Sequence, residues 1–234
     1  MDVTQPTAPA TATDDGVEPL PTGAALRRTG PADAPTVLMV NGGSAADVPG
    51  TWSPSLEWLV DHLAPRFPDL GFVEVRYRTR SWKRLDSCIR DGRAALAAVR
   101  AAGAPRVCML GFSMGGGVAL TCAADPAVRH VVGLAPWVPP SIDLAPLRGA
   151  RVAVFHGSID GFLPGIPGVS PGHSHLVVKA MHDLGVDARH TLIRGAFHGL
   201  ALRPLGIRTP LPRARTWARH VEGEIARFAA GGGV

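Results

Sequence analysis

A five-residue turn between an apolar run and a helical segment constrains the fold of this chain more than any other feature. The turn reads Gly111-Phe112-Ser113-Met114-Gly115, and the apolar run 107–110 precedes it. Residues 116–120, with the sequence GGVAL, follow the turn and begin the predicted helix. Glycines at both ends allow strained backbone and close packing, so a strand can turn directly into a helix with the serine exposed. The segment therefore predicts a buried strand, a sharp turn and a packed helix.

Short apolar runs alternate with helical patterns along most of the chain. The predicted strands cover residues 36–40, 72–76, 106–110, 130–134, 151–155 and 189–193. The predicted helices cover residues 54–66, 84–102, 114–124, 174–184 and 213–229. Continuous apolar runs are typical of parallel strands that are buried on both faces. The alternation predicts an α/β fold with a mostly parallel sheet and helices on both faces.

The composition favours one packed domain. Hydrophobic residues make up 46% and charged residues 18% of the 234 residues, which predicts a globular domain over residues 20–230. Residues 1–19 are rich in Thr, Ala, Pro and Asp without a hydrophobic period, and we expect a disordered tail there. No apolar run approaches the roughly 18 residues of a membrane helix, and no signal-type apolar segment begins the sequence. We expect a cytoplasmic protein that is a monomer or homodimer and does not bind a membrane.

Charge, cysteine and histidine patterns point to no cofactor. The net charge of +5 comes almost entirely from arginine, and without a nucleic-acid motif it indicates a solvated surface rather than a nucleic-acid partner. Cys88, Cys108 and Cys122 have no C-x-x-C spacing, so we expect reduced, buried thiols. His173 and His175 have no third ligand at metal-site spacing. We therefore interpret them as surface histidines and predict no metal.

Two further motifs follow predicted strands and contain the partners that a reactive serine needs. A serine hydroxyl becomes a good nucleophile when a histidine takes its proton and an acid orients that histidine. Asp160 ends the segment HGSID after strand 151–155, and His198 lies in AFHG after strand 189–193. Ligands of parallel sheets bind beyond the carboxyl ends of the strands, where all these residues lie. Asp143 is an alternative acid, and His156 is interpreted as a packed structural histidine.

The serine turn, HGSID and AFHG together resemble the α/β-hydrolase superfamily, particularly its compact dienelactone-hydrolase-like branch, over roughly residues 36–228. The resemblance implies Ser113 as nucleophile, His198 as general base and then acid, and Asp160 as the carboxylate that orients the imidazole. Dienelactone hydrolases proper use a cysteine nucleophile, whereas this chain has Ser113. We therefore predict a serine esterase rather than a lactone hydrolase.

The resemblance also suggests where an oxyanion would bind. Residues 41–44, Asn-Gly-Gly-Ser, stand where the family has a His-Gly pattern. The amide of Gly43, or alternatively that of Ser44, would then act together with the amide of Met114.

Aromatic residues near strand ends are candidates for substrate binding. Trp52, Trp82 and Trp137 each follow a predicted strand, and Phe162 follows Asp160; such positions line pockets or pack in the core. Loops 161–172 and 203–212 are expected to form flaps beside the site. Arg78 and Arg80 could bind an acidic substrate, although solvation of their side chains is the simpler interpretation.

The sequence thus predicts hydrolysis of a small carboxylic ester or related acyl compound through an acyl-enzyme on Ser113. The short segment between residues 134 and 151 leaves no room for a large lid, which favours a small substrate. A peptidase or acyltransferase could use the same residues, and a non-catalytic small-molecule-binding protein could share the fold.

Overall fold

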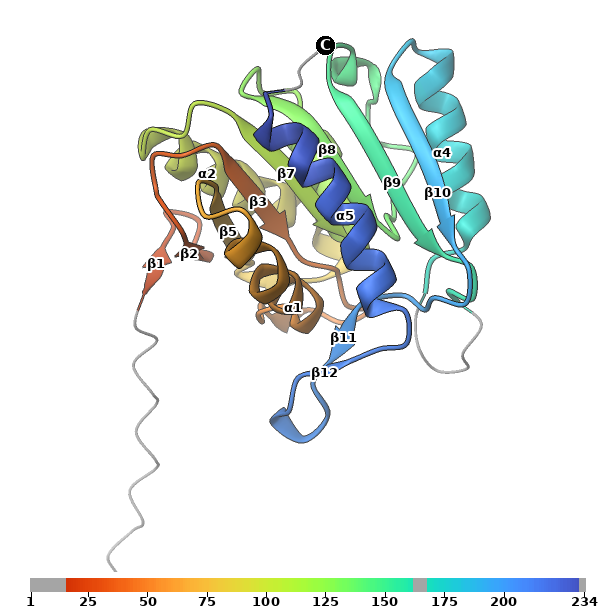
Figure 1. Ribbon diagram of the computed structural model, residues 1–234, viewed down its shortest axis with the longest axis horizontal. Helices are drawn as coiled ribbons and strands as arrows, with labels where there is room; N and C mark the ends of the chain where they lie inside the picture. The colour runs from red at the N-terminus through yellow and green to blue at the C-terminus, as the bar shows by residue number, and fades with distance from the viewer. Residues whose placement is uncertain (1–15, 162–167, 232–234) are drawn as a thin grey trace, which may run out of the picture.

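The computed structural model describes residues 16–161 and 168–231, and its centre is an eight-stranded sheet (Figure 1). The strands lie in the order β1-β2-β5-β3-β7-β8-β9-β10. Their bounds are β1 Val17–Pro19, β2 Ala25–Thr29, β3 Thr36–Val40, β5 Gly71–Arg76, β7 Val107–Phe112, β8 Val128–Leu134, β9 Arg151–Gly157 and β10 Asp187–Ile193. Strands β1 and β2 pair antiparallel, as do β2 and β5, while every pairing from β5 to β10 is parallel. The predicted mostly parallel sheet is confirmed.

Helices cover both faces of the sheet, as predicted. Helices α1 and α5 lie on the face toward the viewer in Figure 1, and α2, α3 and α4 pack against the other face. Their bounds are α1 Pro54–Leu63, α2 Leu85–Ala101, α3 Met114–Cys122, α4 Pro171–Asp183 and α5 Ala214–Ala229. Successive side chains of a strand point to opposite faces. Leu38 and Val40 of β3 accordingly join the core under α2 and α3, whereas Val37 and Met39 join the core under α1 and α5.

Shorter elements lie outside the eight-stranded sheet. Two small antiparallel pairs join β4 Val48–Pro49 to β6 Thr79–Arg80 and β11 Ala201–Leu202 to β12 Thr209–Pro210. In the described part of the chain, 3-10 turns cover Ala64–Arg66, Trp82–Arg84, Ala145–Leu147 and Pro204–Gly206. The predicted second flap, residues 203–212, is therefore largely the connection and return strand of a β hairpin.

Several boundaries differ from the sequence prediction, among them the end of the expected tail and the start of α4. Residues Val17–Pro19 pair with β2, so the end of the expected tail is an edge strand instead. Helix α4 begins at Pro171, after the cap Ser170, rather than at residue 174. Proline fits the first turn of a helix because its missing N–H has no partner there in any case.

The three cysteines are buried and free, as predicted. Burial raises the pKa of Cys88 to about 11 and that of Cys122 to about 12, so both thiols stay protonated at neutral pH. Among the described helices, none has the length and apolar character needed to cross a bilayer.

Candidate active site

The turn after β7 holds Ser113 in a strained conformation. Ser113 has φ 55° and ψ −121° and directly precedes α3, a backbone geometry that side-chain-bearing residues rarely adopt. A Cβ added at Gly111 would lie 2.1 Å from the carbonyl oxygen of Gly115, and one added at Gly115 would lie 2.3 Å from that of Val40. Both positions therefore require glycine. The packing of the turn, and not the serine alone, fixes the backbone geometry.

Neighbouring loops hold this turn through backbone hydrogen bonds. The Ser113 amide donates to the Leu134 carbonyl over 2.9 Å, and the Trp137 amide donates to the Ser113 carbonyl over 2.9 Å. Because β7 and β8 are adjacent parallel strands, the loops at their carboxyl ends meet at the same edge of the sheet. Trp137 consequently lies beside Ser113.

The structure brings Ser113, Asp160 and His198 to this edge. Asp160 follows β9 and His198 follows β10, and the Nδ1 atom of His198 lies 2.6 Å from Oδ2 of Asp160. Ser113 and His198 line one cavity of about 200 Å³. The Phe112 ring packs against the His198 ring with centroids 5.1 Å apart. His198 therefore presents one ring nitrogen to the acid while sharing a cavity with the serine.

A second histidine contacts the same carboxylate. His156 is fully buried, and its Nε2 atom lies 2.9 Å from Oδ2 of Asp160 and 2.8 Å from the Val169 carbonyl oxygen. The Val169 amide donates to Oδ1 of Asp160 over 3.1 Å. Burial favours a raised pKa for Asp160, but hydrogen bonds from His156 and His198 outweigh it and lower the pKa. Asp160 is thus ionised at neutral pH.

The contact between His156 and Asp160 was not predicted from the sequence. His156 is a packed histidine, as expected, but it also links the candidate acid to the loop before α4. The available signal was the four-residue spacing within HGSID, which places both side chains near the end of one strand.

The loop after β3 is fixed by the side chain of Asn41. The Gly42 amide donates to Oδ1 of Asn41 over 2.7 Å, and Nδ2 of Asn41 donates to the Thr51 carbonyl over 3.1 Å. Tyr77 donates its hydroxyl to the Asn41 carbonyl over 3.0 Å. Asn41, which stands where the resemblance leads one to expect histidine, therefore shapes the loop and occupies the amide of Gly42.

Gly43 lies directly against Met114 and Trp82. A Cβ added at Gly43 would lie 2.8 Å from the Met114 sulfur and 2.2 Å from Cδ1 of Trp82. Within residues 16–161 and 168–231, neither the Gly43 amide nor the Met114 amide has a hydrogen-bond acceptor. Gly43 thus lies beside Met114, and its amide stays the predicted second donor of an oxyanion site.

The rival residues from the sequence lie elsewhere. Asp143 is exposed and its carboxylate accepts the Ala145 amide over 2.9 Å, which caps a turn. His175 is exposed as expected, but His173 is half-buried and accepts the Val138 amide over 3.1 Å. No group of three or more metal-ligating side chains occurs in the described part of the chain.

Of the four aromatic candidates for substrate binding, only some line the cavity at Ser113. Trp82 and Trp137 line the 200 Å³ cavity together with Ser113 and His198. Trp52 does not line it, because the guanidinium groups of Arg27 and Arg76 stack on the Trp52 ring, 4.4 and 5.1 Å from its centroid. Phe162 lies outside the described residues.

A second, mainly apolar cavity of about 300 Å³ lies next to the first. Its lining includes His198, which also lines the first cavity, and Phe112 of the serine turn. The other apolar residues of its lining are Ile159, Phe197, Ala201, Leu202 and Leu211. Ser55 also lines this cavity, but its hydroxyl is occupied by backbone groups of Leu200 and Ala201. The sequence did not predict this cavity because its walls come from four separate segments.

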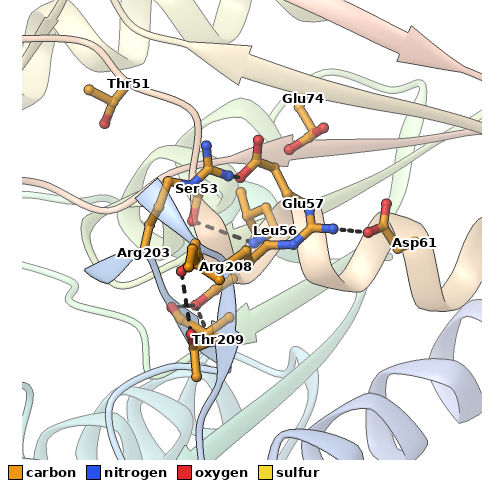
Figure 2. Close-up of polar contacts among 12 residues, drawn as sticks. Thr51, Ser53, Leu56, Glu57, Asp61, Glu74, Arg203, Arg208 and Thr209 are labelled. Atoms are coloured by element: carbon orange, nitrogen blue, oxygen red, sulfur yellow. Dashed lines mark hydrogen bonds and ion pairs between the residues drawn. The ribbon is translucent and has the colours of Figure 1, made fainter. Parts of the chain in front are cut away.

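The hairpin beside this cavity is fastened to α1 by ion pairs. Figure 2 shows Arg203 reaching Glu57, and Arg208 reaching Asp61. Glu57 also pairs with Arg27 at 2.9 Å. These contacts hold the segment that carries Leu202 and Leu211 over the edge of the sheet.

Comparisons with known proteins agree with this architecture. No family model and no curated protein matches the chain. Among solved structures, MGS-M1, an alpha/beta hydrolase enzyme from a Medee basin deep-sea metagenome library, is 17% identical with a TM-score of 0.68, covering 92% of this chain and 98% of that one. Esterase 2 of Thermogutta terrifontis phosphorylated by paraoxon is 17% identical with a TM-score of 0.63, covering 91% and 94%. Est1E from Butyrivibrio proteoclasticus is 11% identical with a TM-score of 0.66, covering 92% and 100%. The strand order, the parallel register and these likenesses show that the chain has the α/β-hydrolase fold.

Proposed function

We propose that this chain is a serine hydrolase that cleaves a small carboxylic ester or related acyl compound through an acyl-enzyme on Ser113. The observation that carries the proposal is the arrangement around His198. One of its nitrogens lies 2.6 Å from the ionised Asp160, and the same ring shares a cavity with the strained Ser113. A histidine that is bound to an ionised acid and lies in the same cavity as a serine is the arrangement needed to activate a serine hydroxyl.

The proposed reaction has two halves. His198 takes the proton of the Ser113 hydroxyl as the serine oxygen attacks the carbonyl carbon, and the amides of Gly43 and Met114 bind the resulting oxyanion. His198 then gives the proton to the departing alcohol, which leaves an ester on Ser113. Water attacks that ester with His198 again as base, and release of the acid restores the free serine. Asp160 keeps the imidazole in one tautomer throughout.

A structural neighbour supplies a suitable probe. Esterase 2 of Thermogutta terrifontis is phosphorylated by paraoxon, and such reagents mark activated serines. We expect paraoxon to transfer one diethylphosphoryl group to Ser113 of this chain, which mass spectrometry of the intact protein and of its peptides would detect.

Substitution of the serine provides the decisive test. Ser113→Ala should lower hydrolysis of p-nitrophenyl acetate by roughly 10⁴-fold or more and abolish labelling. Ser141→Ala, a change on an exposed loop outside the cavity, is the matched control and should keep both. Circular dichroism should show both variants folded. Full activity or labelling of Ser113→Ala would disprove the mechanism.

A further inference from the structure

The apolar cavity beside His198 has a specific place in the proposed reaction. It shares His198 with the cavity that contains Ser113, but it is not lined by Ser113, Trp82 or Trp137. A group in the apolar cavity therefore reaches the histidine, whereas a group beneath the tryptophans reaches the serine. Each cavity can therefore hold a different part of an ester substrate.

The chemistry of bond cleavage decides which part of the ester, acyl or alcohol, lies in which cavity. The acyl carbon bonds to the Ser113 oxygen, and its carbonyl oxygen points to Gly43 and Met114, which pack beside Trp82. As the bond from that carbon to the alcohol oxygen breaks, the proton that His198 took from Ser113 passes to the alcohol oxygen. The alcohol oxygen must therefore lie next to His198. We propose that the apolar cavity binds the alcohol part of the ester, an assignment that rests on the proposed function.

The lining of the cavity defines the alcohol. Its walls are mainly Phe112, Phe197, Leu202 and Leu211, and no Asp, Glu, Lys or Arg side chain lines it in the described part of the chain. A charged or polyhydroxylated alcohol would lose hydration there without compensation. An apolar cavity of roughly 150 Å³ is large enough for benzene, and this one has about 300 Å³. The expected substrates are esters of medium-length alkyl or aryl alcohols with a short acid.

Two series of esters test which part the cavity takes. In the first, acetates carry alcohols of increasing length, and in the second, ethyl esters carry acids of increasing length. We expect kcat/KM to rise up to about fourfold per methylene along the alcohol series, until the cavity is full. The acid series should show no comparable rise. A rise confined to the acid series would overturn the assignment, while cleavage of neither series would count against the proposed function.

Two leucines of one hairpin give a matched pair of variants. Leu202 lies on the cavity wall and is half-exposed, whereas Leu205 at the hairpin tip is fully exposed and outside the cavity. Leu202→Asp should lower the ratio of kcat/KM for hexyl acetate over ethyl acetate by about tenfold. Leu205→Asp should leave that ratio unchanged. Equal effects of the two changes would contradict the proposal.

Binding of the product alcohol tests the site without turnover. In Ser113→Ala, 1-hexanol should bind saturably, as measured by chemical-shift changes in NMR spectra. Adding Leu202→Asp should weaken this binding about tenfold, and adding Leu205→Asp should not change it. Absence of saturable binding would overturn the assignment of the cavity. Saturable binding by a protein that cleaves no ester would support the apolar site and reject the hydrolase proposal, so the two failures are distinguishable.

Discussion

His156 shows how one buried residue can control a reaction without touching the substrate. It donates toward both Oδ2 of Asp160 and the carbonyl of Val169. Its hydrogen bond helps to lower the pKa of Asp160, against the effect of burial. A hydrogen bond to a charged group contributes about 1.5–3 kcal/mol. His156 is therefore a positioning residue for the carboxylate and for Val169, just before α4.

Substitution of His156 should change the pH profile as well as the rate. His156→Leu removes one of the hydrogen bonds that lower the pKa of Asp160 against the effect of burial. The pKa of Asp160 should therefore rise, and the acid limb of the kcat/KM profile should move to higher pH. We expect kcat/KM at pH 7 to fall roughly 10- to 100-fold, in line with the lost hydrogen bond. His156→Gln, whose amide can still donate, should recover most of the activity. An unshifted acid limb in the leucine variant would show that His156 serves packing alone.

Sequence analysis could predict those candidate site residues whose location depends only on their spacing from a nearby strand. Ser113, Asp160 and His198 each lie just after a strand, so the parallel topology alone brings them together. Trp52 also follows a predicted strand, yet Arg27 and Arg76 stack on its ring from other segments. Contacts between distant segments, such as this stacking, leave no periodic signal in the sequence.

Among the elements, the β11–β12 hairpin is attached to α1 by two side-chain ion pairs. Arg203 contacts Glu57, and Arg208 contacts Asp61, both on α1 (Figure 2). Asp61 is 60% exposed, so its pair with Arg208 contributes at most about 1 kcal/mol to the free energy of unfolding. Glu57 is only 8% exposed, but it keeps Arg27 as a partner when Arg203 is lost, so its charge is not left unpaired. The pairs matter more for local order than for global stability, because the hairpin has few buried residues of its own.

Removal of both arginines should therefore loosen the hairpin selectively. In Arg203→Gln/Arg208→Gln, thermolysin should cut near Leu205 and Ile207 several-fold faster, while the urea-derived free energy of unfolding falls by no more than about 2 kcal/mol. Arg90→Gln, which breaks an exposed pair with Asp86 on α2, should leave hairpin cleavage unchanged. Equal cleavage rates in all three proteins would mean that the ion pairs do not order the hairpin.

The elements that sequence analysis missed share a physical reason. Strand β1 has three residues, and β11 and β12 have two each, too few to show the alternation that marks a strand. Strand β2 contains Arg27 and Arg28 in a five-residue segment. Arg27 is accommodated by Glu57 and Glu74 from other elements. The parallel strands, by contrast, have five to seven residues each and were all predicted, and β3 and β7 among them carry continuous apolar runs.

Across the whole molecule, one buried carboxylate ties α5 to the sheet. Glu224 of α5 is fully buried. It lies near side chains from three adjacent strands and its own helix, namely His130 of β8, Arg151 of β9, Arg189 of β10 and Arg227 of α5. Three arginines already compensate the single negative charge. The neighbouring imidazole of His130 is therefore most stable in its neutral form.

This cluster makes the stability of the fold sensitive to acid. Burial, followed by the nearby arginines, lowers the pKa of His130 from 6.5 to about 4. Between those values the unfolded chain binds a proton that the folded protein does not, so the free energy of unfolding decreases as pH falls from about 6.5 to about 4. One pKa unit corresponds to about 1.4 kcal/mol, so we expect His130 to account for about 2–3 kcal/mol of this loss by pH 4.5.

The contribution of His130 can be isolated by comparing two proteins at two pH values. Urea unfolding of the wild type and of His130→Gln at pH 7 and pH 4.5 gives the change in free energy for each protein. Other histidines and Asp160 titrate in both proteins and cancel in the difference. Because glutamine does not titrate, the wild type should lose about 2–3 kcal/mol more than the variant on acidification. Equal losses would show that His130 is protonated as readily in the folded protein as in the unfolded chain, and the acid sensitivity would then have to arise elsewhere.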